Sequence, residues 1–501
     1  MPRAIIPVQP QRGKAAGLIG LGFVTAVYLI IVLTLPLATA FQFGEDEGFE
    51  VIKPLLCNKG HALYTEIWND QPPVLTRLLA VTFKVFGTSI WTARCVAVAF
   101  GLVLLVSFFE LVRRRTGDWA AILTSLLLLT APSVLLLSVS IMLELPAFAT
   151  AIAAAWVLEI WGNKRHWLWL VISGALMAVA LQIKLTSALV LPAVGLQLCG
   201  FVRQKPTRAW LQRILSRGSV WVLSLMMLYA LIGFTWGRGS LATSWRSHTS
   251  TQTIAGLDDA QNRKFDPHLL LVHLESVLTG AVAVVLAARQ KRMREIFFPL
   301  VLLATAVFVH TFHRPWWNYY YLHFAIPIAW LTGWGIHEIL CALLRFYATT
   351  QFSLLSLRGW KMLVLCLLAA LPLARSERRF EGILGDLRQR PSFESNSIIS
   401  KMKKHAAETK WVYSESGIYP FLVGLPVPPE LAIIMPKRFW SGQITTAKII
   451  ETCRRYVPEM IILPIQSTSF EWEDFLQSRY SRATNDNASV LFIQKTPKVG
   501  L

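Results

Sequence analysis

The chain has 501 residues, of which 54% are hydrophobic and only 16% are charged, with a formal net charge of +20. Soluble domains carry about 25% charged residues, and apolar runs of about 20 residues recur along this chain, so the composition excludes an ordinary soluble protein and indicates a polytopic α-helical membrane protein. The positive charge does not indicate a nucleic-acid partner, because cations collect in the cytoplasmic loops of membrane proteins and the sequence shows no zinc-finger or RNA-binding pattern. The six cysteines form no CxxC pair, so we expect neither a disulfide framework nor a cysteine metal site.

Eleven apolar runs predict about 11 transmembrane helices. They lie near residues 17–40, 91–112, 118–138, 145–161, 167–183, 186–202, 219–236, 269–288, 296–312, 320–341 and 361–375. Only Lys184 and Leu185 separate the fifth run from the sixth, so a bent or re-entrant pair is an alternative there. The first run is too long for the core of a signal peptide, and we expect it to be a retained span.

The charges of the loops predict the orientation. If the N-terminus is cytoplasmic, the cytoplasmic loops hold the basic clusters at 113–115, 164–165, 203–217, 289–294 and 345–361. The connections on the other side hold fewer cations, as the positive-inside rule requires. We therefore expect a multi-pass protein of the plasma (inner) membrane, with a cytoplasmic N-terminus and an extracytoplasmic C-terminal part.

Two extracytoplasmic segments have structure of their own. In the loop 41–90, residues 47–57 and 74–86 place apolar side chains at helical spacing and predict two helices at the membrane surface. After residue 376 the long apolar runs stop, and a small α/β domain is expected from short strands at 410–413, 460–464 and 491–494 and a helix at 443–456. The predicted domains are thus a transmembrane domain, 1–375, and a soluble domain, 376–501.

A cluster of carboxylates follows the first span. Ionisable groups near a membrane are costly, which makes Glu45, Asp46 and Glu47 candidates for chemistry. Crowding of like charges favours a retained proton on one of them, and a carboxylate beside a hydroxyl can act as a general base. A helix N-terminus also favours acidic residues, so helix capping and catalysis are both open for this triplet.

Three more polar residues are expected on the same side of the membrane. Glu144 follows the third span, where it either caps the next helix or contacts a substrate hydroxyl. Asp70 and Gln71 precede a pair of prolines that starts the second surface helix, and their side chains are expected to point toward Asp46.

The candidate cations lie after the fifth and ninth spans. Lys184 either extends to the lipid headgroups or binds a phosphate. The run from 313 to 323 is rich in tryptophan and tyrosine, which are typical of membrane interfaces, but its adjacent histidine and arginine also suit a phosphate. The members of this run that we expect at a phosphate are His313, Arg314, Tyr319, Tyr320 and Tyr321.

The order of these features resembles a known family. The ordered set is Asp46-Glu47 after the first span, Gln71-Pro72-Pro73, Ala93-Arg94 and Gly101 in the second span, Arg113 to Gly117 inside, Glu144, Lys184 and the run His313 to Tyr321. This set, over residues 15–340, resembles the GT-C glycosyltransferases of the protein O-mannosyltransferase and lipid A aminoarabinose transferase (PMT-like) type. The sequence departs from that pattern at Gln71, which replaces a lysine or histidine, and at Phe49, which stands where aminoarabinose transferases often have an arginine.

The resemblance implies an inverting transfer of a sugar from a polyprenyl-phosphate donor to an acceptor hydroxyl on the non-cytoplasmic face. Asp46 matches the family's general base and Glu144 its second acidic position, and we expect Glu47, Asp70, Gln71 and Glu144 to contact the acceptor or the sugar. The cations and tyrosines of the preceding paragraphs are expected to bind the donor phosphate. The expected partners are the lipid-linked donor, membrane lipids, and a cell-envelope lipid, glycan or protein acceptor, but no nucleic acid.

No nucleotide is needed for this reaction, because the leaving group is the lipid phosphate. No reliable metal site is evident either, although Asp46, Glu144 and His313 are able to converge on a divalent ion. Two other classes stay open. A transporter is expected to have charged residues near the middle of the bilayer and repeated spans, and a non-catalytic scaffold for envelope glycan assembly is expected to keep its function after Asp46→Asn.

Overall fold

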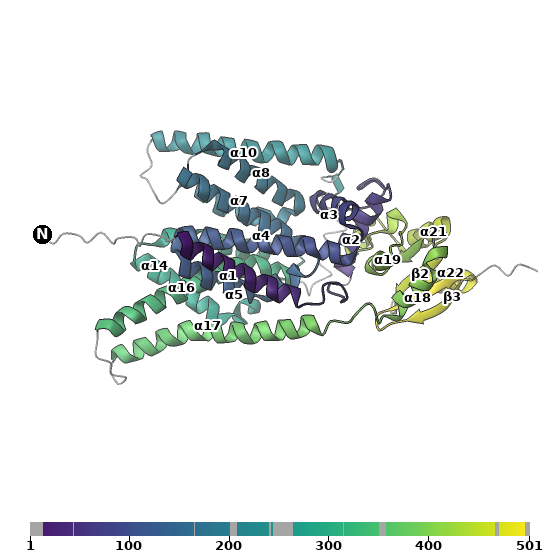
Figure 1. Cartoon of the computed structure of the whole chain (residues 1–501). Coiled ribbons are helices and arrows are strands. Elements are labelled where there is room, and N and C mark those ends of the chain that lie inside the picture. The colour runs from purple at the N-terminus through teal and green to yellow at the C-terminus, as the bar shows by residue number, and fades with distance from the viewer. Residues whose placement is uncertain are drawn as a thin grey trace, which may run out of the picture.

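The computed structural model describes residues 14–43, 45–164, 166–200, 208–239, 242–243, 264–313, 315–349, 357–465 and 470–495. The chain forms an elongated body with a bundle of long helices at one end and a small sheet at the other (Figure 1). The first helix starts at the end of the bundle that is far from the sheet. Helix α16 ends and helix α17 begins at that end too, so the start of α1 and the C-terminal part are on opposite sides of the bundle.

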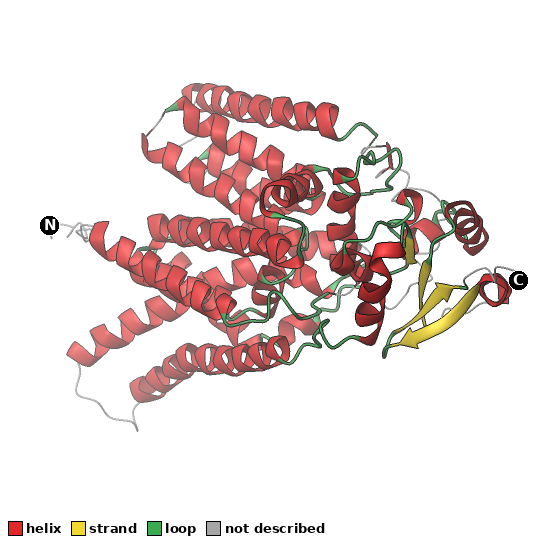
Figure 2. Cartoon of the chain, turned by 45° about the vertical axis from the view of Figure 1, so that its right-hand side comes forward, coloured by secondary structure: helices red, strands yellow, loops and turns green. Residues whose placement is uncertain are grey.

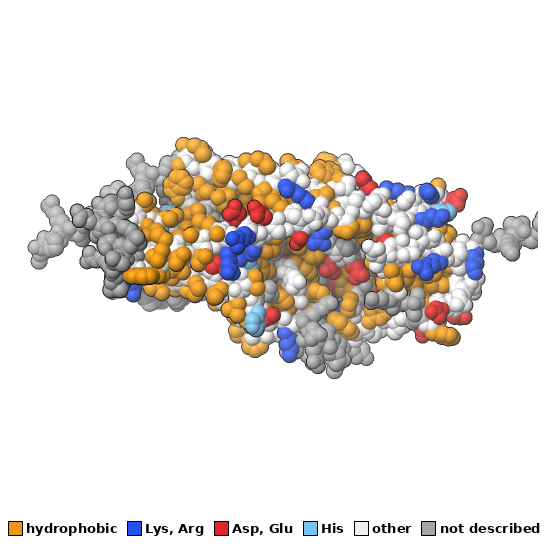
Figure 3. Space-filling model, turned by 90° about the horizontal axis from the view of Figure 1, so that it is seen from below, with side chains coloured by type: hydrophobic (Ala, Val, Ile, Leu, Met, Phe, Trp, Pro, Cys, Tyr) orange, Lys and Arg blue, Asp and Glu red, His pale blue; other side chains and the backbone are white. Residues whose placement is uncertain are grey.

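Apolar helices build the bundle. They are α1 (Lys14–Leu33), α4 (Ile90–Thr116), α5 (Asp118–Leu129), α6 (Pro132–Ser138), α7 (Glu144–Lys164), α8 (Trp167–Ile183), α9 (Leu191–Cys199), α10 (Arg208–Trp236), α13 (His268–Leu271), α14 (Leu274–Arg289), α15 (Phe297–Phe312), α16 (Leu322–Thr349) and α17 (Leu357–Arg388), with the short 3-10 helices η1 (Leu185–Val190), η2 (Met293–Glu295) and η3 (Asn318–Tyr321). Hydrophobic side chains cover much of the bundle surface on the face shown in Figure 3. This is the surface expected of a protein that lies in lipid.

Helical structure lies at each of the eleven predicted spans. Within the described ranges, five helices are long and apolar enough to cross a membrane, and there are six spans if α5 and α6, which meet at a bend of 72°, count as one. These findings support a multi-pass membrane protein, and the number eleven stays a prediction. The first helix ends at Leu33 rather than near residue 40, because Pro36 follows and the residue before a proline avoids helical geometry.

The two helices predicted in the loop 41–90 are α2 (Glu45–Asn58) and α3 (Val74–Phe86). They lie between the bundle and the C-terminal part (Figure 1). Helix α3 ends at Gly87, whose φ of 86° is in the region that favours glycine. Its buried side packs on the protein, whereas Val81, Val85 and Phe86 are exposed. This leaves an apolar face that is suited to a membrane surface.

The C-terminal unit, residues 389–495, contains a four-stranded sheet covered by short helices (Figure 2). The strands are β1 (Val412–Ser414), β2 (Met460–Pro464), β3 (Tyr480–Asn485) and β4 (Ser489–Gln494), and the helices are α18 (Ser397–His405), α19 (Ile418–Val423), α20 (Pro436–Trp440), α21 (Thr446–Tyr456) and α22 (Phe470–Arg479), with η4 (Ala406–Glu408) and η5 (Pro429–Leu431). The sheet order is β1-β2-β4-β3, with β1 and β2 parallel and the other neighbours antiparallel. The change of composition at residue 376 falls inside α17, which continues to Arg388 as one helix.

The C-terminal unit and the loop 41–90 share one hydrophobic core. Ile52 and Leu56 of α2 belong to the same buried cluster as Ile418 and Phe421 of α19. The two backbones approach closely: a Cβ on Gly48 would lie 2.5 Å from the backbone nitrogen of Ile418. Only glycine fits at this contact, and the contact fixes the C-terminal unit against the first turns of α2.

Candidate active site

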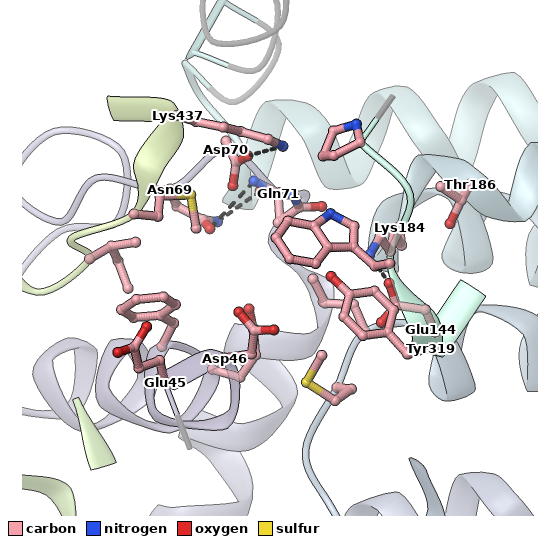
Figure 4. A pocket seen from close by; sticks show the side chains of 18 of the residues that line it. Glu45, Asp46, Asn69, Asp70, Gln71, Glu144, Lys184, Thr186, Tyr319 and Lys437 are labelled. Carbon is pink, nitrogen blue, oxygen red and sulfur yellow. Dashed lines mark hydrogen bonds and ion pairs between the residues drawn. The ribbon is translucent and has the colours of Figure 1, made fainter. Parts of the chain in front are cut away.

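A cavity of about 740 Å³ lies where the loop 41–90, the bundle and the C-terminal unit meet. Its wall is formed mainly by six parts of the chain: the first turns of α2, residues 69–72, the start of α7, residues 184–186, five residues from His313 to Tyr320 (His313, Pro315, Trp317, Tyr319 and Tyr320), and residues from the range 433–440. Figure 4 shows polar side chains from these parts pointing toward a common space. The cavity is therefore a mixed site, with an apolar lining and a few charged groups, as is typical of small-molecule and lipid sites.

Asp46 points into this cavity from the first turn of α2 (Figure 4). The backbone N–H groups of a helix N-terminus favour a carboxylate there, which stabilises the ionised form of Asp46. Glu45 lies beside it at the open rim, where partial loss of hydration raises the pKa of its carboxyl. Glu45 is exposed to solvent, and its side chain is also part of the cavity wall.

Glu47, the third member of the triplet, points away from the cavity. Its side chain is fully buried and accepts two hydrogen bonds from Arg94, at 2.9 and 2.6 Å, and one from the backbone N–H of Ile141, at 3.0 Å. A third nitrogen of Arg94 donates to the carbonyl of Leu37 at 2.8 Å. Successive residues on a helix point about 100° apart, which separates Asp46 from Glu47. This geometry makes Glu47 a structural residue and gives no support to the predicted contact with acceptor or sugar.

Glu144 and Lys184 form an ion pair on the wall that α7 and the α8–η1 connection build. Glu144 is fully buried, and its second oxygen, Oε2, has no hydrogen-bond partner among the described residues. The ammonium group of Lys184 lies 5.4 Å from the ring centre of Tyr319 and 5.2 Å from that of Tyr320. The aromatic rings and the carboxylate hold the cation at the cavity, where it can meet an anion.

Asp70 and Gln71 both line the cavity, as does His313. Asp70 is buried and pairs with Lys437 of the C-terminal unit, with 3.3 Å between Nζ and Oδ2. Burial lowers the pKa of His313, and the charges of Lys437 and Lys184 lower it further. The imidazole is thus disposed to stay neutral, so that it can donate one hydrogen bond and accept another.

The structure does not bring all predicted phosphate ligands to the cavity. Tyr319 and Tyr320 line it, but Tyr321 does not. Tyr321 stacks on His273 at 4.8 Å and borders a separate, small pocket. Arg314 lies outside the described residues. Tyr321 differs from Tyr319 and Tyr320 because Asn318–Tyr321 form a 3-10 turn, in which adjacent side chains point in different directions.

Several residues that line the cavity were not predicted from the sequence. Glu50 and Lys53 pair at 2.8 Å, and Lys53 also donates to Asn69 at 3.2 Å. Positions 46, 50 and 53 share one face of a helix, so the helical period alone was enough to group them with Asp46. No local signal marks Lys437, because it reaches the cavity through a contact between distant parts of the chain. Among the described residues, no three or more His, Cys, Asp or Glu are placed to hold a metal ion.

Residues 70–236 match the family described as dolichyl-phosphate-mannose-protein mannosyltransferase. The matched range contains Asp70, Glu144 and Lys184 but begins after Asp46. A search of curated proteins gave no match.

Solved structures with the same fold cover almost the whole chain. Undecaprenyl-phosphate-bound ArnT from Cupriavidus metallidurans has a TM-score of 0.63 and 15% sequence identity, over 96% of this chain and 99% of that one. The oligosaccharyltransferase of Archaeoglobus fulgidus tethered to an acceptor peptide has a TM-score of 0.55 and 11% identity, over 97% of this chain and 75% of that one. Archaeoglobus fulgidus AglB in complex with an inhibitory peptide and a dolichol-phosphate has a TM-score of 0.53 and 12% identity.

The chain therefore has the fold of the GT-C membrane glycosyltransferases. Together with the family match over residues 70–236, this fold supports the resemblance to the PMT-like glycosyltransferases of the GT-C superfamily that was read from the sequence.

Proposed function

We propose that the protein transfers a sugar from a polyprenyl-phosphate donor to an acceptor hydroxyl, with inversion at the anomeric carbon and Asp46 as the general base. The observation that carries this proposal is the placement of Asp46 and the Lys184–Glu144 pair on the wall of one cavity. A carboxylate and a cation that face the same hollow provide the two charges that glycosyl transfer needs. The undecaprenyl phosphate in the similar Cupriavidus metallidurans structure supports a lipid phosphate as the donor group.

The chemistry follows from these two charges. The acceptor oxygen attacks the anomeric carbon while its proton passes to the Asp46 carboxylate. The bond from the anomeric carbon to the phosphate oxygen breaks, and its electron pair leaves with the phosphate, which becomes a polyprenyl phosphate monoester. Negative charge grows on that oxygen, and Lys184 stabilises it from the cavity wall. Attack opposite the leaving group inverts the configuration.

The remaining cavity residues have supporting roles in this proposal. Glu144 orients Lys184 through one oxygen, and its Oε2, which has no partner among the described residues, accepts a hydrogen bond from a sugar hydroxyl. Tyr319, Tyr320 and His313 contribute donors to the phosphate. The C-terminal unit is on the opposite side of the bundle from the start of α1 (Figure 1). The positive-inside rule assigns that side to the extracytoplasmic face of the plasma membrane.

Transfer by the purified full chain in lipid nanodiscs tests the proposal. Wild type is offered a panel of undecaprenyl-phosphate sugars together with extracted envelope lipids, glycans and peptides, and release of undecaprenyl phosphate is followed by mass spectrometry. Asp46→Asn keeps the size of the side chain but removes the base, so we expect transfer to fall by roughly 10²- to 10⁴-fold with unchanged thermal unfolding. Glu473→Gln, an exposed change on α22, is the matched control and is expected to keep full activity.

Two results contradict the proposal. If wild type consumes none of the donors, the assignment as a polyprenyl-phosphate-dependent transferase fails. If Asp46→Asn transfers sugar as fast as wild type, Asp46 is not the base. If that variant transfers no sugar but keeps full biological function, the result favours a scaffold. Movement of an intact lipid-linked sugar across the bilayer, without release of the lipid phosphate, favours a transporter.

A further inference from the structure

Lys437 brings a cation from the C-terminal unit into the cavity. It belongs to the short helix α20 (Pro436–Trp440), and neighbouring residues 433, 435, 436 and 440 line the cavity with it. In Figure 4, Lys437 extends over Asp70 on the side of Gln71, apart from Lys184. A part of the chain that is distant in sequence from the membrane helices therefore adds a charge to the site.

The three lysines that line the cavity differ in how firmly they are held. The side chain of Lys53 is 3% exposed and has two partners, Glu50 and Asn69. That of Lys184 is 10% exposed and is enclosed by Glu144 and two tyrosine rings. Lys437 is 18% exposed and has the longest ion-pair contact, 3.3 Å to Asp70. Among the described residues, Asp70 is the one ion-pair partner of Lys437, so this partly hydrated ammonium turns to an incoming anion at the lowest cost.

The position of Lys437 is fixed by the docking of the C-terminal unit. The indole of Trp68 donates to Gln443 at 2.6 Å, and the guanidinium of Arg438 lies 5.2 Å from the ring centre of Trp68. The close approach of Gly48 and Gly417 anchors the same unit to α2. Arg438 belongs to α20 and Trp68 directly precedes residues 69–72, so α20 cannot move away from the cavity without breaking the contact between them.

The segment 69–72, which forms this part of the wall, contains no cation of its own. Gln71, which lines the cavity beside Asp70, is neutral. The influence of Lys437 on the pKa of His313, next to that of Lys184, shows that both ammonium groups act on the same region of the cavity. Two lysines and a neutral imidazole around one space form a receptor for a phosphate with up to two negative charges.

We propose that Lys437 is a ligand of the lipid phosphate, so that the C-terminal unit supplies one wall of the phosphate site. This inference rests on the proposed function and adds to it a phosphate contact from outside the membrane domain. When the phosphate enters, the ammonium of Lys437 exchanges part of its contact with Asp70 for a phosphate oxygen. The contact strengthens as the phosphate gains its second negative charge on release from the sugar.

Binding of undecaprenyl phosphate to the full chain in nanodiscs tests this inference, with undecaprenol as the neutral probe. We expect Lys437→Met to weaken binding of undecaprenyl phosphate by roughly 10- to 100-fold, since a charge-assisted hydrogen bond is lost, and to leave binding of undecaprenol unchanged. Lys437→Arg keeps the charge and should retain most of the affinity. Lys404→Met, which removes an exposed lysine of α18, is the matched control and should bind as wild type.

A double variant separates a phosphate ligand from a residue that only neutralises Asp70. If Lys437 contacts the phosphate, Asp70→Asn alone does not weaken binding, and Asp70→Asn with Lys437→Met stays at least about tenfold weaker than wild type. If Lys437 only neutralises Asp70, the double variant recovers wild-type affinity and the inference is overturned. Wild-type affinity in Lys437→Met also overturns it while leaving the proposed function intact. Failure of wild type to distinguish undecaprenyl phosphate from undecaprenol overturns both.

Discussion

Two buried ion pairs near the start of α2 have the same chemistry but different surroundings. Glu47 and Arg94 are both about 1% exposed and satisfy each other and two backbone groups. Glu144 and Lys184 lie on the cavity wall, and one carboxylate oxygen of Glu144 is unpartnered among the described residues. A fully satisfied pair holds the fold, whereas a pair with spare hydrogen-bonding capacity beside a hollow is available to a substrate. The same substitution at each carboxylate tests this distinction.

The largest effect on the fold is expected from Glu47→Gln. An amide cannot balance the buried charge of Arg94, and loss of one partner of a buried pair costs about 3–5 kcal/mol. We expect a large drop in the thermal unfolding temperature of the purified protein, followed by scanning calorimetry or by exposure of buried cysteines. Glu473→Gln on the exposed face of α22 serves as control. Wild-type stability of Glu47→Gln together with lost transfer contradicts the structural role and returns Glu47 to the site.

Glu144→Gln should have the opposite profile. The amide oxygen still accepts a hydrogen bond from Lys184, whose side chain is 10% exposed at the cavity, so we expect a stability change of about 1 kcal/mol. Transfer should fall by roughly 10- to 100-fold, because Lys184 is less firmly oriented and a charged acceptor for a sugar hydroxyl is lost. Transfer kinetics and thermal unfolding are measured on the same samples. A loss of stability as large as that of Glu47→Gln removes the contrast between the two pairs.

A smaller, pH-dependent effect is expected at Glu415, where the C-terminal unit meets the rim of the cavity. Burial, with a contribution from the charge of Glu45, raises the pKa of Glu415 to about 7. The folded chain therefore holds a proton between about pH 4.5 and pH 7 that the unfolded chain has lost, and stability falls as pH rises through that window.

Glu415→Gln removes the titrating carboxyl and therefore the loss of stability that accompanies rising pH. We expect the variant to gain about 1–3 kcal/mol over wild type at pH 8 and to match it near pH 4.5. Unfolding temperatures at a series of pH values give the result, and Glu473→Gln should show no such trend. A difference between Glu415→Gln and wild type that does not change with pH contradicts the assignment.

The sequence predicted most of the helical architecture, because it depends on local patterns. Apolar runs and their flanking charges locate the bundle helices, and helical spacing locates α2 and α3. The end of the first helix at Leu33 was missed, although Pro36 signals it. In the C-terminal unit, β3 and α22 were missed, since Tyr480–Asn485 is an edge strand with mostly exposed side chains and no apolar alternation.

The candidate site was predictable only in part. Asp46, Glu144 and Lys184 follow from their places at the ends of spans, where a charge is conspicuous. The ion-pair partner of Glu47 is Arg94, which is 47 positions away in the sequence. The partner of Asp70 is Lys437, which is 367 positions away. Pairings over such distances are set by tertiary packing, and no period or spacing in a single sequence encodes them.

The shared core of the loop 41–90 and the C-terminal unit has a consequence for synthesis of the chain. Trp68 is made early, whereas its partner Gln443 follows 375 positions later. Until then α2 and α3 lack the surface on which they pack, and closing so long a loop is a slow step in folding. The cavity therefore assembles last, so a chain still in synthesis, or one cut short before α20, holds Asp46 on an unfinished surface.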